Sequence, residues 1–429
     1  MSLHNTVYIV DGARTPFLKA RSHVGPFSSS DLAVDCGRNL LLRQNFKPNQ
    51  LDEVIIGSTV MNACEPNVAR VIGLRLGAKD VPAFTVQRNC ASGLQALDSA
   101  AQLIQLGRHQ LVLAGGADDM SRSPLLFPHS MANWLGDLNS AKTWSERLKV
   151  IAQFRPGFLK PTLSLLKGLS DPTVGLSMGQ TAENLAYQFN ITREQMDAYA
   201  LQSHQRSAYA QAKGYFSEII PIYDDKGQCY DKDDGVRIDS SMEKLAKLKP
   251  FFDKPFGNVT AGNSSQITDG AALLILASEA AVKQYNLPVL ARIVDAQWAA
   301  LPPEIMGLGP VHAITPLLMR NKMKLNDINY YEINEAFAAQ VIACFKAWED
   351  KTYCTQALGL QDAFGSIDQD TVNIDGGAIA VGHPVGASGA RLVLHLAHIL
   401  KRQRARYGIA SLCIGGGQGG AMLIENINA

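Results

Sequence analysis

The sequence predicts an α/β protein in which two related halves are separated by an inserted segment. Two observations carry this prediction. Patterns typical of buried strands and amphipathic helices recur at a nearly constant offset of roughly 300 residues, and the region between about residues 122 and 249 matches neither half. A chain of 429 residues, 46% hydrophobic and 18% charged, is also long and apolar enough for two or three well-packed domains.

The first half begins with a run typical of a buried strand, Val7–Asp11. Cys90-Ala-Ser-Gly93 then opens a stretch whose apolar residues fall on one face of a helix, and residues 111–114 form the next strand. A continuous apolar run at 268–276 predicts a strand that returns to the same sheet. This half is predicted to comprise residues 1–121 and 250–285.

The second half, assigned to residues 286–429, repeats this order. Ala291–Asp295 matches the first strand, Gly386-Ala-Ser-Gly389 opens an amphipathic helix, and a strand at 409–413 ends in glycines. Strands as apolar as these are typical of sheets that are buried on both faces. The repeat therefore predicts two similar βαβ-rich units.

The insertion is predicted to span residues 122–249 and to cover one face of the core. Within it, Thr192 followed by Gln195 is the capping-box pattern that begins a helix.

Net charge and cysteine usage exclude several classes of protein. Forty basic and 39 acidic side chains leave a net charge of +1, which gives no domain-wide attraction for nucleic acid or an anionic membrane. No apolar run approaches the roughly 20 residues of a transmembrane helix, and no signal peptide is expected at the N-terminus. Seven dispersed cysteines without a CxxC pair disfavour disulfides and a zinc site. We expect a reduced, cytoplasmic protein that binds no metal.

Cys90 and His383 occupy equivalent positions in the two halves, each just before a predicted helix. A thiol at a helix N-terminus faces unpaired backbone N–H groups and the positive end of the dipole, which favour the thiolate. His383 is held between Gly382 and Pro384 in a loop with few other side chains. Because the repeat places the two helix starts side by side, His383 is predicted to serve Cys90 as a base. A structural cysteine and an incidental histidine are the alternatives.

Two further segments carry candidate chemistry. Cys413 is followed by a glycine-rich run, Gly415–Gly420, at the end of a strand. This run lacks the ending of a phosphate-binding loop, and its bare backbone could form an oxyanion hole. Asn334 and Glu335 follow another predicted strand. They could cap the next helix, or Asn334 could hold a water against a developing oxyanion, and the sequence leaves both interpretations open.

Together these segments resemble the thiolase family over nearly the whole chain. The matching stretches are Asn89-Cys90-Ala-Ser-Gly-Leu-Gln-Ala, Met178-Gly-Gln-Thr-Ala-Glu183, Val259-Thr-Ala-Gly-Asn-Ser-Ser265, Asn334-Glu335-Ala-Phe-Ala338, Gly382-His383-Pro-Val-Gly-Ala-Ser-Gly389 and Cys413-Ile-Gly-Gly-Gly-Gln-Gly419. The resemblance implies the five-layer αβαβα fold of thiolases, with two pseudo-symmetric halves and an inserted loop domain that binds coenzyme A.

The resemblance also implies a role for each matching residue. Cys90 would be the nucleophile that carries the acyl group as a thioester, and His383 would be its base. Cys413 would exchange the proton at the α-carbon of acetyl-CoA. Asn334, through a water, and His383 would line one oxyanion hole, and the backbone N–H groups of Cys90 and Gly415 would form the other. The implied contacts to coenzyme A are Ser265, Met178, Ala261, Gly262 and, near the adenine, Arg237.

Departures from the family pattern narrow the subtype. Asp118 stands where many members have glutamate, Ser177 stands where acetoacetyl-CoA thiolases often have histidine, and residues 348–370 form an extension. With Arg147-Leu-Lys and Thr192-Arg-Glu-Gln, these features are most similar to the β-subunit of the trifunctional complex of fatty-acid β-oxidation. The resemblance implies a 3-ketoacyl-CoA thiolase, an acetyl-CoA C-acyltransferase that uses coenzyme A and acetyl-CoA as substrates and keeps no cofactor permanently bound. An acetyl-CoA C-acetyltransferase (acetoacetyl-CoA thiolase) is the alternative.

Other functions fit less well. A ketoacyl synthase of the same fold would need a second active-site histidine where this chain has Cys413, and a non-catalytic lipid carrier or scaffold would not need every catalytic position filled. The implied partners are further copies of this chain, as a homodimer or tetramer, and the hydratase/dehydrogenase α-subunit. The apolar runs 123–128 and 158–166 either pack on the core or, as we hypothesise, form a lid or docking surface for long acyl chains or a membrane.

Overall fold

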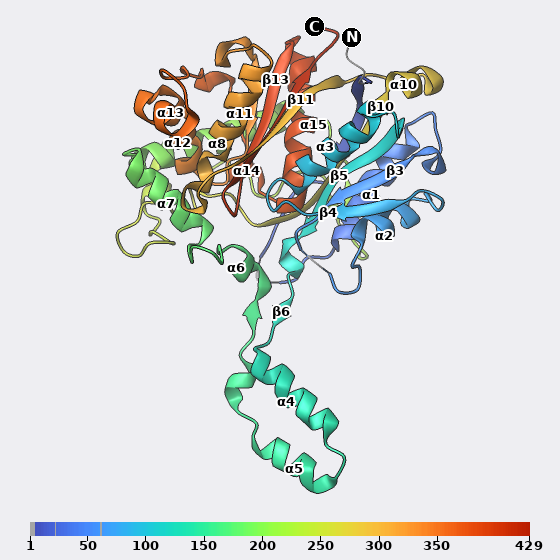
Figure 1. The fold of residues 1–429 in the computed structure, drawn as a ribbon, viewed down its shortest axis with the longest axis vertical. Helices are drawn as coiled ribbons and strands as arrows, with labels where there is room; N and C mark the ends of the chain where they lie inside the picture. The colour runs from blue at the N-terminus through green and yellow to red at the C-terminus, as the bar shows by residue number, and fades with distance from the viewer. Residues whose placement is uncertain (1–4, 22, 61) are drawn as a thin grey trace.

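Two half-sheets organise the computed structural model, which describes residues 5–21, 23–60 and 62–429 (Figure 1). The strands of the N-terminal half-sheet are, in spatial order, β1 (Val7–Arg14), β10 (Thr268–Ser278), β5 (Leu111–Asp119), β3 (Glu53–Gly57) and β4 (Ala83–Val86). Those of the C-terminal half-sheet are β11 (Ala291–Ala300), β14 (Gln418–Glu425), β13 (Tyr407–Ile414) and β12 (Tyr330–Ile333).

The two half-sheets share one pairing pattern. From β1 to β3 and from β11 to β12, neighbouring strands pair antiparallel, antiparallel and then parallel. The strand predicted at 268–276 returns to the first half as expected, between β1 and β5. Short antiparallel pairing of β1 with β11, from Val7 opposite Ile293 to Ile9 opposite Ala291, joins the two into one hydrogen-bonded path.

Helices form layers outside and between the half-sheets. The central layer is α3 (Ser92–Gln105) and α15 (Val385–Gln403); the outer layers are α1 (Ser29–Leu42) with α2 (Val68–Arg75), and α11 (Gly309–Arg320) with α12 (Ala338–Glu349). Because the side chains of a strand alternate between its faces, Leu111 and Leu113 of β5 pack with the outer helices, whereas Val112 and Ala114 pack with the central ones. The predicted five-layer fold is confirmed.

The two central helices meet through glycines at their N-terminal ends. A Cβ atom at Gly93 would lie 2.7 Å from the carbonyl oxygen of Gly386 and 2.9 Å from the backbone nitrogen of Ala390. A Cβ atom at Gly389 would run into the backbone of Leu94. Only residues without a side chain allow this approach, and it places the helix starts that follow Cys90 and His383 against each other.

Part of the insertion covers the C-terminal half. α7 (Met178–Gln188) and α8 (Arg193–Lys213) pack on α12, and α7 also packs on the 3-10 helix η4 (Pro303–Leu308). The predicted capping box is present, because the Thr192 side chain accepts a hydrogen bond from the backbone N–H of Gln195 and the Gln195 side chain accepts one from the backbone N–H of Thr192.

The prediction that the whole insertion covers the core is wrong for residues 125–163, which we call the hairpin. Its elements are β6 (Leu125–Leu126), α4 (His129–Ser140), α5 (Trp144–Ala152), η3 (Pro156–Leu159) and β7 (Thr162–Leu163). The hairpin projects away from the layered body (Figure 1). Its helices pack on each other instead: the ring centroids of Trp134 and Phe154 are 5.2 Å apart, and the Trp134 indole donates to the carbonyl of Val150 at 2.8 Å.

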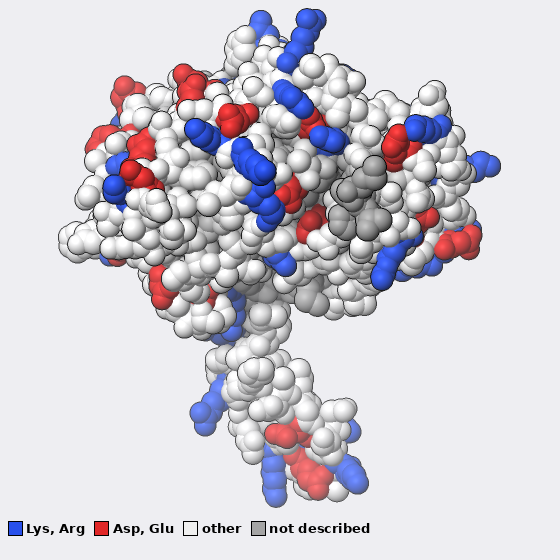
Figure 2. All heavy atoms as spheres, turned by 45° about the horizontal axis from the view of Figure 1, so that its top comes forward, with Lys and Arg blue, Asp and Glu red and all other residues white. Residues whose placement is uncertain are grey.

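Short elements complete the described chain. They are β2 (Leu18–Lys19), η1 (Pro48–Gln50), η2 (Met120–Arg122), α6 (Ser164–Gly168), β8 (Ile222–Tyr223), β9 (Cys229–Tyr230), α9 (Met242–Ala246), α10 (Glu279–Tyr285), η5 (Leu325–Asp327), α13 (Lys351–Leu358), η6 (Gln369–Thr371) and α14 (Ala378–Val381). Among the described residues, no helix combines the length and the hydropathy needed to cross a bilayer. Acidic and basic side chains are interspersed over the face of the body seen in Figure 2.

Candidate active site

Cys90 lies in the turn between β4 and α3, and neighbouring side chains hold that turn. Asn89 adopts a left-handed conformation with φ of 44°, and its side-chain amide donates to the carbonyl of Gly415 at 2.8 Å. The Ser92 hydroxyl donates to the carbonyl of Asn89 and accepts from the backbone N–H of Arg88, both at 2.8 Å. These bonds join the Cys90 turn of one half to the glycine loop of the other.

The Cys90 thiol is in its neutral form at neutral pH. Burial raises its pKa above the ordinary value of 9.0, and the backbone N–H groups of Gly415 and of Cys90 itself only partly oppose this shift. The backbone N–H groups thus act in the expected direction, toward the thiolate, but burial has the larger effect on the pKa of Cys90. The same N–H groups are the pair expected at one oxyanion hole.

His383 is fixed by its own backbone and by a serine one turn into α15. Its N–H donates to the carbonyl of Gln266 at 3.0 Å, and its Nδ1 lies 2.5 Å from Oγ of Ser388. The Ser388 hydroxyl has one proton, which points to the carbonyl of Pro384 at 3.0 Å. With its proton directed to Pro384, the Ser388 hydroxyl oxygen accepts a hydrogen bond from Nδ1–H, and this assigns the free lone pair of the imidazole to Nε2.

The imidazole is neutral and faces an amide. Burial, with a smaller contribution from the charge of Arg391, lowers the pKa of His383 to about 3. Nδ2 of Asn334 lies 3.4 Å from Nε2 of His383. Asn334 is fully buried, and its Oδ1 has no hydrogen-bond partner within the described part of the chain.

The interpretation of Asn334 and Glu335 as helix caps is wrong. Helix α12 begins at Ala338, its N-cap is Phe337, and that cap makes no side-chain hydrogen bond. Glu335 instead accepts from the Ser203 hydroxyl at 2.6 Å and from the side-chain amide of Asn373 at 3.0 Å. These bonds to α8 and to the loop before His383 hold the segment in which Asn334 lies.

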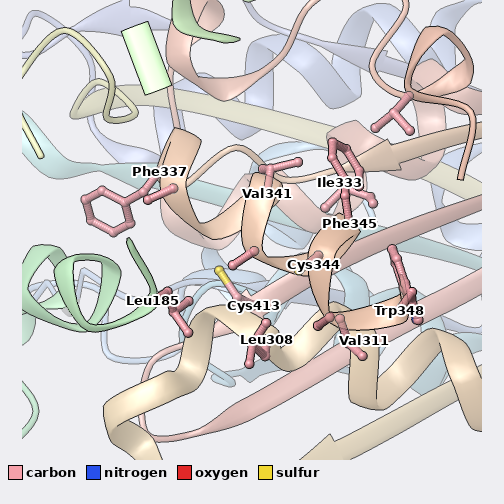
Figure 3. Packing of buried hydrophobic residues seen from close by; sticks show 14 of the residues in the cluster. Leu185, Leu308, Val311, Ile333, Phe337, Val341, Cys344, Phe345, Trp348 and Cys413 are labelled. Atoms are coloured by element: carbon pink, nitrogen blue, oxygen red, sulfur yellow. The ribbon is translucent and has the colours of Figure 1, made fainter. Parts of the chain in front are cut away.

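Cys413 is surrounded by apolar side chains. It is fully buried in the core cluster of the C-terminal half, near Leu185 and Leu308 (Figure 3). Burial raises the pKa of this thiol well above its ordinary value, and the nearby thiols Cys90 and Cys344 add to the shift. The two cysteines singled out by sequence are thus electrostatic neighbours, although they lie about 320 residues apart in the chain. All seven cysteines lie in the described part of the chain, and all are free.

A cavity of about 710 Å³ opens beside Cys90. Of the residues predicted to serve the site, Cys90, Gly415 and Met178 line it. Ser265, Arg237, Ala261 and Gly262 are not part of this lining. The chain turns toward His383 directly after Ser265, whose N–H donates to the carbonyl of Ala336 at 2.9 Å, whereas Arg237 is exposed. Gly262 is buried under Leu245 and Leu248, and Ala261 is exposed.

Comparison with known proteins decides the family. The family description "Thiolase, N-terminal domain" matches residues 7–280, and "Thiolase, C-terminal domain" matches residues 287–426. The chain belongs to the thiolase family. The predicted family, fold and acyltransferase class of this thiolase are thereby confirmed.

Similar thiolases cover nearly the whole chain. The bovine mitochondrial trifunctional enzyme subunit beta is 37% identical over 98% of this chain and 88% of its own, and the rat mitochondrial 3-ketoacyl-CoA thiolase is 38% identical over 99% and 100%. Among solved structures, the acetyl-CoA acetyltransferase of Bacillus anthracis has a TM-score of 0.85 at 37% identity and covers 99% of this chain and 100% of its own. Human mitochondrial 3-ketoacyl-CoA thiolase in complex with CoA has a TM-score of 0.84 at 37% identity, with 99% of both chains covered.

Ser388 was not predicted from the sequence as a partner of His383. The internal repeat could have indicated this residue, since Ser388 in Gly386-Ala-Ser-Gly389 is the counterpart of Ser92 in Cys90-Ala-Ser-Gly93. Both hydroxyls donate back to a carbonyl at the start of their helix. The role of Asp118 was not predicted either. Its carboxylate joins the two halves at the site, because it accepts from the N–H of Gly386 at 2.5 Å and from that of Thr59 at 2.7 Å. Across residues 5–21, 23–60 and 62–429, no cluster of three or more His, Cys, Asp or Glu is arranged to hold a metal ion.

Proposed function

We propose that this thiolase cleaves 3-ketoacyl-CoA with coenzyme A, giving acetyl-CoA and an acyl-CoA shortened by two carbons. One observation carries the proposal: the Cys90 thiol and the N–H of Gly415 meet at the cavity, next to the second thiol of Cys413. A nucleophile, backbone donors for an oxyanion and a further proton-carrying group are what such a reaction needs.

In the first half-reaction, Cys90 takes the acyl group. The thiol proton passes to Nε2 of His383, and Sγ attacks the C3 carbonyl of the substrate. The bond between C2 and C3 then breaks, and C2 takes a proton from the Cys413 thiol as acetyl-CoA leaves. Cys90 now holds the acyl group as a thioester, Cys413 is a thiolate and His383 is protonated.

In the second half-reaction, coenzyme A removes the acyl group. Its thiol proton goes to the Cys413 thiolate, and its sulfur attacks the thioester carbonyl. The tetrahedral intermediate expels the Cys90 thiolate, which recovers its proton from His383. Two oxyanions form in succession. We assign the stabilisation of one to the backbone N–H pair of Cys90 and Gly415 and of the other to the Asn334–His383 pair.

The raised thiol pKa and lowered imidazole pKa support a neutral resting pair. Proton transfer from Cys90 to His383 is unfavourable on its own, so stabilisation of the oxyanion must drive it. Truncating Asn334 to alanine should therefore lower kcat about 100- to 1000-fold, the usual effect of losing one oxyanion donor, with little change in KM.

The test compares wild type with Cys90→Ala in thiolysis of a 3-ketoacyl-CoA, with trapping of the acyl-enzyme by mass spectrometry. Wild type should form acetyl-CoA and carry the acyl group on the Cys90 peptide, and Cys90→Ala should do neither. Cys64→Ala, which removes an exposed cysteine outside the cavity lining, is the matched control. Thiolysis that survives in Cys90→Ala would overturn the proposal. A strong preference for acetoacetyl-CoA would favour the acetyl-CoA C-acetyltransferase alternative instead.

We also propose the partners and location that the sequence predicts. The names of relatives support a complex with a hydratase/dehydrogenase α-subunit, because several are trifunctional enzyme β-subunits. Self-association as a homodimer or tetramer and a cytoplasmic location stay predictions, and the relatives are named as mitochondrial. Mass photometry of the purified chain, alone and with an α-subunit, tests both kinds of association.

The hairpin supports peripheral contact with a membrane surface. Its large apolar side chains are exposed, with Trp144 at 72% and Leu148 at 51%. From residue 125 to 163 the sequence has five basic residues against two acidic ones, a balance that favours an anionic lipid surface. Sedimentation with vesicles of phosphatidylcholine and phosphatidylglycerol tests this. Trp144→Ser with Leu148→Ser should release the protein, whereas Leu42→Ser, on a leucine of the body that is 79% exposed, should not.

A further inference from the structure

A buried ion pair connects the same two elements that carry Asn334 and His383. Nη1 of Arg391 donates to Oε2 of Glu332 at 2.7 Å, and both side chains are buried. Glu332 lies in β12, two residues before Asn334, so the two side chains leave the strand toward the same side. Arg391 lies in α15, which begins two residues after His383. The ion pair is therefore the next contact between β12 and α15 beyond the site.

The Arg391 charge acts on the imidazole of His383. Burial has the larger effect on the lowered pKa of His383, and the guanidinium of Arg391 adds to it. In the proposed reaction this imidazole takes the Cys90 proton and becomes a cation. A second cation in the same buried region opposes that step, because charges interact strongly where water is excluded. A carboxylate paired with Arg391 reduces this opposition.

The pair is poorly suited to a role in stability alone. Within the described part of the chain, Oε1 of Glu332 and Nε of Arg391 are buried without a hydrogen-bond partner. Moving two charges out of water costs free energy that one hydrogen-bonded contact returns only in part. By contrast, the fully buried Arg14 donates two hydrogen bonds to Asp233 and one to Glu218. The incomplete Glu332–Arg391 pair therefore indicates an electrostatic role at the site.

We propose that Glu332 is a positioning residue for the proton transfer: its carboxylate offsets the charge of Arg391 and so allows His383 to accept the proton of Cys90. The inference rests on the proposed function and adds to it the state that the resting enzyme must have, an ionised Glu332. When Glu332 takes up a proton, the Arg391 charge acts on the imidazole without compensation and the transfer is suppressed.

Glu332 changes its charge near neutral pH. Burial raises its pKa to about 7, and the charges of Arg391 and His395 on α15 partly oppose this shift. The nearby carboxylates of Asp375 and Glu335 add to it. His395, whose pKa its two carboxylate partners raise to about 9 against the effect of burial, is charged throughout this range. Asp375 is ionised, because its bond to His395 helps to lower its pKa despite burial. Protonation of Glu332 is therefore the expected change around pH 7.

The experiment follows kcat for thiolysis between pH 5 and 9. Wild type should become faster with pH, with an inflection near 7. The imidazole of His383, whose pKa burial lowers to about 3, should give no inflection in this range. Glu332→Gln keeps the shape of the side chain and leaves Arg391 unpaired. Its kcat should lack the inflection and should lie about tenfold below wild type at pH 8, the effect of one pKa unit on a proton transfer.

A double variant separates charge from structure. Glu332→Gln with Arg391→Met removes both charges and should recover most of the wild-type kcat, again without the inflection. If the pair served only to join β12 to α15, the double variant would be no faster than Glu332→Gln. Asp233→Asn is the matched control: it breaks another buried ion pair, with Arg14, and should lower stability while the inflection near pH 7 stays.

Nuclear magnetic resonance of protein labelled with ¹³C-histidine gives a readout without turnover. The His383 signal, identified by its loss in His383→Gln, should shift with an inflection near pH 7 in wild type and should not in Glu332→Gln. Two results would overturn the inference: an inflection that persists in Glu332→Gln, or a folded double variant that is as slow as the single one. Absence of thiolysis in wild type would refute the proposed function itself, and the His383 titration would still decide whether Glu332 acts on the imidazole.

Discussion

Nδ1 of His383 lies 2.5 Å from Oγ of Ser388, whose own proton is directed to the carbonyl of Pro384. This contact determines which imidazole nitrogen can accept a proton. With Nδ1 as the donor, Nε2 keeps its lone pair on the side of Asn334. A serine that touches no reacting atom thereby selects the tautomer on which the proposed proton transfer from Cys90 depends.

Replacing Ser388 with alanine should lower kcat on the order of tenfold, the effect of one lost hydrogen bond on a positioned group. The imidazole then loses its Nδ1 partner and can populate the other tautomer, in which Nε2 carries the proton. KM and the melting temperature should change little. Ser388→Thr keeps the hydroxyl and should restore most of the rate. A full rate in Ser388→Ala, measured across the pH profile, would show that the tautomer is selected by other contacts.

The rate of alkylation of Cys90 by iodoacetamide should increase continuously as pH rises toward and past 9.0, the ordinary pKa of a cysteine thiol. A raised pKa means that the reactive thiolate is scarce at neutral pH and grows about tenfold per pH unit. His383, whose pKa is lowered to about 3, cannot hold a thiolate–imidazolium pair at neutral pH. Mass spectrometry of the Cys90 peptide measures the rate, with exposed Cys64 in the same digest as a monitor of the reagent. A rate that stays flat between pH 6 and 8 would instead indicate a preformed ion pair.

Gly93→Ala should separate the starts of α3 and α15. The new Cβ would lie 2.7 Å from the carbonyl oxygen of Gly386, a backbone atom that cannot move aside cheaply. We expect a loss of about 1–3 kcal/mol in the free energy of unfolding, typical of overpacking, and a lower kcat because the Cys90 and His383 turns move apart. Gly136→Ala in the hairpin is the control, since a Cβ there meets open space and should be neutral or slightly stabilising. Chemical denaturation and thiolysis rates decide the matter; wild-type values for both in Gly93→Ala would contradict the packing argument.

His395 should make stability depend on pH in the alkaline range. Its Nδ1 lies 3.0 Å from Glu218 and its Nε2 lies 3.0 Å from Asp375. Burial disfavours the charged ring, but the two carboxylates prevail and raise the pKa of His395 from 6.5 to about 9. The stabilisation is complete below pH 6.5, where the unfolded chain is protonated too, and it is lost as pH rises through 9. It amounts to roughly 3 kcal/mol.

Urea denaturation of wild type and His395→Gln between pH 6 and 9.5 tests this pH dependence. The difference in the free energy of unfolding should be largest at pH 6 and should shrink toward pH 9.5. Arg402, which donates to Asp375 at 2.6 Å, remains as a partner in the variant. A difference that grows with pH would contradict a protonated His395.

The layers and the approach of the Cys90 and His383 helix starts were predictable because they depend on local patterns and on the repeat. Apolar strands, glycine-rich helix starts and the equivalence of Cys90 with His383 all follow from residue order. The protonation of Cys90 was not predictable, since burial depends on atoms from distant segments and here outweighs the helix terminus. The projection of the hairpin away from the body was not predictable either, because its helices are as rich in apolar residues as helices that pack in a core. Ser265 and Arg237 match the family pattern, yet neither lines the cavity beside Cys90, and their roles stay predictions.

Where the hairpin leaves the body, its two arms are joined to each other by the β6–β7 ladder, by the Ser123–Ser164 contact and by the N–H groups of Ser164 and Leu165. The far end of the hairpin, with exposed Trp144, is therefore connected through these joined arms to the cavity wall that includes Leu165. Thermodynamic linkage then applies in both directions: if attachment of the far end to a surface shifts the affinity for an acyl chain by some factor, the bound chain must shift the affinity for that surface by the same factor. In such an enzyme, the length of the bound acyl chain and the affinity of the hairpin for a surface would influence each other.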